Sequence, residues 1–209
     1  MTEQEWLTCE DPMSIMKFLR GKTSARRVAL FAIAACRQAQ WMMTNPISRS
    51  RNAVEWAERV VEGLASLNDG DGPSDGDCYL MGAAANRCMV AACCAAKGDG
   101  TRAAENGLEF VEVLLETEED DEPSELAGLM RDIFGNPFRP VSADSIWLTS
   151  NVLALATGIY QDRAFDRLSI LADALQDAGC DNADILTHCR SEAPHVRGCW
   201  VVDLLLGKT

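Results

Sequence analysis

The sequence predicts an all-α protein, an irregular bundle of about nine to ten helices. Three observations support this fold class. Apolar residues recur at steps of three and four, which is the spacing of one helix face. Residues that favour helix N-termini precede several of these runs. No segment alternates apolar and polar residues as a half-buried strand does.

The first two helices are indicated by their N-terminal signals. Thr2 and Glu5 have the spacing of a capping box, which predicts a short helix at the start of the chain. Asp11 followed by Pro12 repeats the signal, because Asp caps helices well and Pro suits the first turn. We expect a second short helix over PMSIMKFLR.

Longer helices follow in the N-terminal part. Ser24 can cap the first of them, and Ser124 can cap the last, ELAGLMRDIF. The stretch CYLMGAAANRCMVAACCAAK consists mainly of small side chains, which let neighbouring helices approach closely. We therefore expect it to be the central helix of this part. The predicted ranges are 25–43, 48–67, 78–97, 101–117 and 125–134.

The clearest break is GNPFRPVSADSIW, residues 135–147, which has a leading glycine, two prolines and no apolar period. We expect it to connect an N-terminal helical part, 1–134, to a C-terminal part, 148–209, built of helical hairpins. Phe138 and Arg139 stand on a rigid turn in this connection, where a partner could contact them. The helices predicted beyond it span 150–161, 164–178, 183–191 and 195–206.

Composition indicates a soluble, cytoplasmic protein. Of the 209 residues 47% are apolar and 24% are charged, which is ordinary for a globular chain. The sequence has no apolar run of bilayer length, and its acidic start lacks the order of a signal peptide. The nine cysteines are odd in number and lie in apolar stretches, so we expect reduced thiols used as small core residues.

Charge is unevenly distributed along the chain. Residues 17–59 contain nine basic and two acidic side chains, a net charge of +7, while the whole chain carries −13 and the remainder therefore −20. Such a segment either faces an anionic partner or is paired within the molecule. We expect internal pairing, for which the acidic run 116–125 offers one counterpart, and no binding to nucleic acid.

Three cysteines and both histidines of the chain fall within residues 179–207. Cys180, Cys189, His195 and Cys199 could supply four ligands to a tetrahedral zinc ion, the last two having helical i, i+4 spacing. The competing interpretation is that the thiols pack in a helical core and that the histidines lie at the surface or cap helices. We expect packing and no cofactor, with zinc as the alternative.

A thiol-dependent hydrolase is a further alternative. Cys189 or Cys199 could act as nucleophile, with His195 as the base and Asp203 orienting it. No nucleophile motif accompanies them, and no phosphate-binding glycine loop is present. We therefore assign no catalytic residue.

Two stretches carry a resemblance to known sequences. The block EWLTCEDPMSIMKFLRGK and the block RDIFGNPFRPV together with HVRGCWVVDLLLGK resemble an uncharacterised planctomycete-type bacterial protein family. FDRLSILADALQDAGCDNADIL, residues 165–186, is similar to the bacterial repeat-companion domain, a small helical module. Arg167, Leu168, Asp173 and Gly179 match its pattern, whereas Leu171 and Ala174 replace its aromatic residues. These resemblances imply helical hairpins and no particular activity.

Our preferred functional hypothesis is a non-enzymatic helical interaction module that binds another macromolecule, a protein rather than nucleic acid. The alternatives are a zinc-stabilised helical domain that contacts nucleic acid through residues 17–59, and the thiol hydrolase. The sequence indicates no oligomeric state.

Overall fold

The structure, a computed structural model, describes residues 1–38, 48–66, 83–117 and 123–208. The predicted all-α class is confirmed. The described residues form eleven α-helices and one 3-10 helix, more than the nine to ten predicted, and contain no strand. None of the helices described is both long and apolar enough to span a bilayer.

The chain divides into two compact units, Met1–Met130 and Arg131–Thr209. The division falls inside a helix, just before the end of the predicted N-terminal part, and the predicted connection 135–147 lies entirely within the second unit. The helices of the first unit are α1 (Glu3–Thr8), α2 (Pro12–Leu19), α3 (Ala25–Gln38), α5 (Ser48–Val61), α7 (Ala83–Ala96), α8 (Gly100–Thr117) and most of α9 (Pro123–Phe134).

The predicted N-terminal caps of the first two helices, α1 and α2, are confirmed. The Thr2 hydroxyl accepts a hydrogen bond from the Glu5 backbone N–H, and the Glu5 carboxylate accepts one from the Thr2 N–H. The carboxylate of Asp11 accepts from two backbone N–H groups in the first turn of α2. Ser124 lies inside α9 and is not its cap, because the helix already begins at Pro123.

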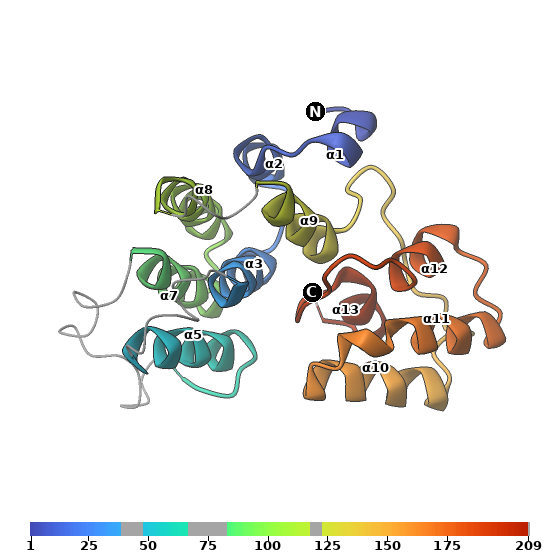
Figure 1. The fold of residues 1–209 in the computed structure, drawn as a ribbon. Coiled ribbons are helices and arrows are strands. Elements are labelled where there is room, and N and C mark those ends of the chain that lie inside the picture. Colours follow the sequence, from blue (N-terminus) through green and yellow to red (C-terminus); the bar gives the residue numbers. More distant parts are fainter. Residues whose placement is uncertain (39–47, 67–82, 118–122, 209) are drawn as a thin grey trace. The chain divides into compact units, whose positions relative to one another are not determined.

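The small-residue helix α7 packs against α3, α5 and α8, as expected for a central helix of this unit. Figure 1 shows it flanked by α5 on one side and α8 on the other. Close approach also depends on Gly107 of α8, where an added Cβ would meet the Val28 side chain of α3 at 2.9 Å. The outer parts of the predicted ranges 25–43 and 78–97 lie outside the described residues.

The basic segment forms ion pairs inside the first unit. Arg26 pairs with Glu62 at 3.1 Å and Arg37 with Glu58 at 2.6 Å, and both carboxylate side chains are buried. Arg20 pairs with Glu105 of α8 at 3.2 Å. These partners lie in or next to neighbouring helices and not in the acidic run 116–125, half of which lies outside the described residues.

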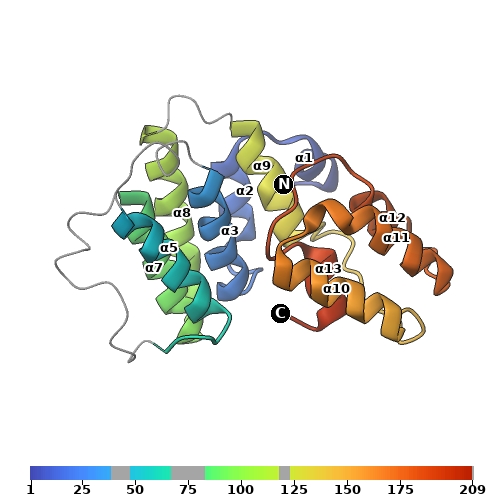
Figure 2. The ribbon, with the colours of Figure 1, turned by 60° about the horizontal axis from the view of Figure 1, so that its bottom comes forward.

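The second unit begins with the last turn of α9. Its other elements are α10 (Ser150–Asp162), the 3-10 helix η1 (Phe165–Arg167), α11 (Leu168–Asp177), α12 (Ala183–Cys189) and α13 (Trp200–Leu206). α10 packs against α11 and α13, and α11 packs against α12. Figure 2 shows these helices, in orange and red, gathered in one group. The predicted helical hairpins are therefore present.

The last helix starts later than the sequence suggested. We expected a helix over 195–206, but α13 begins only at Trp200. Pro194 and Gly198 explain the difference, because Pro disfavours a helical residue before it and Gly198 takes a positive φ of 99°. Residues 190–199 therefore form a loop, and the helical i, i+4 relation of His195 and Cys199 is wrong.

Candidate metal centre

Four potential metal ligands meet in the second unit, although they come from separate segments. Asp132 lies in the last turn of α9, His188 in the last turn of α12, His195 in the following loop, and Cys199 at the N-cap of α13. One ligand atom from each lies within 4.8 Å of all the others. We call these residues the Asp-His-His-Cys cluster.

Their reactive atoms point at one another. His195 Nδ1 lies 2.6 Å from Asp132 Oδ1, and His188 Nε2 lies 3.1 Å from the same oxygen. His188 Nε2 also lies 3.2 Å from Cys199 Sγ. A neutral imidazole nitrogen either donates or accepts, so Nε2 cannot donate to the carboxylate and accept from the thiol at once. The four atoms together form a group that could hold a cation.

The distances suit a small tetrahedral ion. Zinc bonds of about 2.0–2.3 Å to oxygen, nitrogen and sulfur put neighbouring ligand atoms about 3.3–3.8 Å apart. Three of the separations, 2.6, 3.1 and 3.2 Å, are shorter than this range, and all of them lie within 4.8 Å, so the four atoms surround a space of about the size of such an ion. Imidazole and thiolate ligands favour zinc, whereas magnesium and calcium prefer oxygen ligands.

A second layer of contacts orients the ligands. The Val196 backbone N–H donates to Asp132 Oδ2 at 2.9 Å, which turns the other carboxylate oxygen toward the histidines. Ser191 Oγ lies 3.1 Å from His195 Nε2, the nitrogen that faces away from the cluster. The His188 ring packs against the Trp200 ring, and the two ring centroids are 5.2 Å apart. Partners of this kind fix the rotamer and tautomer of metal ligands.

Gly135 completes the packing beneath Trp200. It follows the end of α9 with a φ of 66°, and an added Cβ would lie 3.1 Å from Trp200 Cγ. Any other residue would be strained there and would push the indole that supports His188. The glycine in DIFGNPF thus allows the backbone after α9 to approach the Trp200 side chain closely beside the cluster.

Burial sets the charge states around the cluster. The Asp132 side chain is 3% exposed and Cys199 is fully buried. Burial raises the pKa of Asp132, but hydrogen bonds from His188 and His195 lower it by more, so the pKa falls below its usual value. Burial, reinforced by the charge of Asp132, raises the pKa of the Cys199 thiol well above its usual value. Cys199 is therefore a neutral thiol unless a cation binds it.

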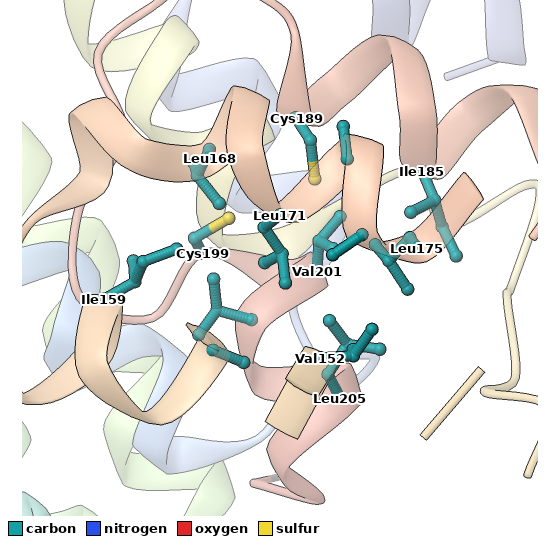
Figure 3. Close-up of a cluster of buried hydrophobic side chains, with 14 of the residues drawn as sticks. Val152, Ile159, Leu168, Leu171, Leu175, Ile185, Cys189, Cys199, Val201 and Leu205 are labelled. Carbon is teal, nitrogen blue, oxygen red and sulfur yellow. The ribbon is translucent and has the colours of Figure 1, made fainter. Parts of the chain in front are cut away.

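The structure joins only part of the predicted ligand set. His195 and Cys199 belong to the cluster, but Cys180 and Cys189 do not. Both lie in the hydrophobic core of the second unit, and Figure 3 draws Cys189 and Cys199 among its apolar side chains. Burial and the Asp132 charge raise the pKa of Cys189 to about 12, as expected for a packing thiol.

Sequence reasoning missed Asp132 and His188. A search for histidine near the predicted ligands could have found His188, the only other histidine in the chain. No nearby sequence pattern marks Asp132 as a ligand, because it lies 63 positions before His195, in α9. The histidines were expected to lie at the surface or to cap helices; their side chains are instead largely buried, with His195 6% and His188 17% exposed.

The other predicted site residues, Phe138 and Arg139, lie on a turn as expected. Asn136 closes it, its side-chain oxygen accepting from the Phe138 N–H at 2.9 Å and its carbonyl from the Arg139 N–H at 3.1 Å. Phe138 is 38% exposed, and the Arg139 guanidinium lies 3.7 Å from the Asp184 carboxylate. The turn is thus closed by two hydrogen bonds, and both side chains are exposed.

Comparison with known protein families, with curated proteins and with solved structures found no match to this chain.

Proposed function

We propose that the second unit is a zinc-stabilised helical domain, with Asp132, His188, His195 and Cys199 as the four ligands. The convergence of one oxygen, two nitrogens and one sulfur within 4.8 Å carries this proposal. Zinc binding would exchange the Cys199 thiol proton, released to solvent, for a zinc–sulfur bond. The fully buried thiolate would then be neutralised by the ion that it binds.

A structural role suits this ligand set better than a catalytic one. Four protein ligands fill a tetrahedral zinc ion, whereas catalytic zinc keeps one position for water or substrate. The four ligands come from the end of α9, the end of α12 and the loop that leads into α13. An ion at this point would tie the end of α9 to the end of α12 and the start of α13.

Metal analysis of the full chain tests the proposal. Protein purified without added metal is expected to contain about one zinc per chain. After exchange for Co²⁺ it should show the absorption of a tetrahedral ion and a thiolate-to-cobalt charge-transfer band. Cys199→Ser should abolish the charge-transfer band, whereas Cys180→Ser and Cys189→Ser should keep it, because those thiols are not ligands.

That comparison also separates the two ligand sets. Loss of the charge-transfer band in Cys180→Ser or Cys189→Ser would restore the set expected from the sequence. A stoichiometry near zero, with no cobalt spectrum after reconstitution, would overturn the proposal.

The buried thiols do not favour the thiol-hydrolase alternative. A nucleophilic cysteine needs a lowered pKa and access to substrate, whereas the pKa values of Cys189 and Cys199 are raised and both side chains are buried. The sequence predicted His195 as the base beside the nucleophile, but the imidazole nitrogen that contacts Cys199 Sγ, at 3.2 Å, belongs to His188. Its nitrogen faces Asp132 as well, whereas a triad places the carboxylate on the opposite ring nitrogen.

As a second candidate function, we propose that the chain binds another protein through the turn that displays Phe138 and Arg139. An exposed aromatic ring beside an arginine on a rigid turn is typical of interface anchors. Proteins from the native host that bind the immobilised wild-type chain should be lost with the double variant Phe138→Ala/Arg139→Ala. They should remain with Ile170→Ala, which removes an exposed apolar side chain of α11. Equal capture by all three proteins would exclude this turn as the binding surface.

A further inference from the structure

A pocket of about 400 Å³ lies in the second unit beside the Asp-His-His-Cys cluster. One wall comes from η1 and the start of α11, and the other from the end of α12 and the loop that follows it. The residues that line it include Asp166, Ser191, Glu192 and His195. His195 is thus shared between the pocket and the cluster.

The His195 ring has a different partner at each nitrogen. Nδ1 belongs to the cluster and lies 2.6 Å from Asp132 Oδ1, whereas Nε2 lies 3.1 Å from the hydroxyl of Ser191. When a metal ion binds Nδ1, the ring proton is on Nε2, and Nε2–H donates to Ser191 Oγ. Metal binding therefore fixes the tautomer for which the Ser191 hydroxyl is the acceptor.

Of the four cluster residues, His195 is the one that the described structure places in the lining of this pocket. Cys199 and Asp132 are almost completely buried, and His188 packs between His195 and Trp200. The His195 side chain is itself only 6% exposed, so it separates the pocket from the other three ligands, and a rotation of this side chain would open the cluster to the pocket.

The charges around the pocket favour a cation. Asp166 and Glu192 contribute carboxylates to its lining. Arg190 also lines it, but its guanidinium donates to Asp173 at 2.8 Å and to Gln176 at 2.9 Å. Its positive charge is thus largely balanced by Asp173, and the field that an approaching ion meets is negative.

We propose that a hydrated divalent cation reaches the cluster through this pocket. Once the ion is bound, the Ser191–His195 hydrogen bond holds the His195 ring in its ligating position. The inference rests on the proposed zinc site. Ser191 is a positioning residue in it, since it acts on the ion only through His195. The pocket carboxylates act on the rate at which the ion arrives.

Release kinetics test the role of Ser191. Zinc-loaded full chain is mixed with an excess of a chromogenic chelator, and the rate of zinc transfer is measured. Ser191→Ala is expected to release zinc about ten times faster, the lower end of the effect of losing such a supporting partner. Ser191→Thr, which keeps the hydroxyl, should restore slow release. Ser191→Ala should lower the melting temperature of the zinc-loaded protein by more than that of the metal-free protein, which separates positioning of the metal ligand from a general structural role.

Uptake kinetics test the route. The double variant Asp166→Asn/Glu192→Gln should bind added Zn²⁺ several-fold more slowly than wild type at low ionic strength, and the difference should shrink at high salt. Asp162→Asn/Asp177→Asn is the matched control, because it removes two exposed carboxylates of the same unit that do not line the pocket.

Equal uptake by the two double variants, or wild-type release from Ser191→Ala, would overturn this inference while leaving the zinc site intact. Absence of zinc binding by the wild-type chain would instead refute the proposed function itself.

Discussion

Removing the metal from the full chain is expected to lower its melting temperature by about 10 °C or more. The reason is that zinc binds the folded second unit far more tightly than the unfolded chain, in which its four ligands are scattered. Without the ion, Asp132, His188 and Cys199 must share protons among atoms about 3 Å apart, and one of their polar contacts stays unsatisfied.

Differential scanning calorimetry with and without a strong chelator measures this effect. His188→Gln is the internal control, since it removes one ligand and should make the melting temperature insensitive to the chelator. The variant and the chelator should therefore lower stability by amounts that do not add. A wild-type protein that loses its zinc and keeps its melting temperature would show that the ion has no part in stability.

Replacing Asp132 by Ala is expected to lower the free energy of unfolding of the metal-free protein by about 3–5 kcal/mol. Asp132 accepts hydrogen bonds from the Val196 N–H and His195, and contacts His188, within a buried site. Its removal leaves these groups without their acceptor and away from water. The loop 190–199 and the end of α12 then lose their common attachment to α9.

Urea denaturation in the presence of chelator measures the loss, with Asp184→Ala as the control. Asp184 is an exposed acidic residue of the same unit, 3.7 Å from Arg139, so its removal should cost less than about 1 kcal/mol. Similar losses for the two variants would mean that Asp132 does not hold the cluster together.

The same carboxylate gives the metal-free protein a defined acid dependence. The pKa of Asp132 in the folded protein lies below the usual 3.8, because hydrogen bonds from the histidines outweigh the effect of burial. Its contribution to stability is therefore complete above about pH 4 and is lost as the pH falls through the lowered value. This loss should be missing from the acid denaturation of Asp132→Ala.

Much of the fold could be predicted from the sequence because the signals for it are local. The Thr2–Glu5 capping box, the Asp11–Pro12 start and the small-residue α7 depend on residues a few positions apart, and the structure has all three as predicted. The predicted start of α13 at residue 195 was wrong, because the range included the residues after Pro194 and up to Gly198, which are not helical.

The sequence alone thus determined the helical class, and it offered His195 and Cys199, half of the candidate site, as ligands only in the alternative to thiol packing. Only the tertiary structure added His188 and Asp132, and only it separated Cys180 and Cys189 from the ligands. The physical reason is that spacing along one helix predicts shared direction, whereas these ligands lie on two helix ends, a loop and a helix cap. Which of their side chains meet depends on how α9, α12 and α13 pack, and that packing is set by the whole apolar core of the second unit.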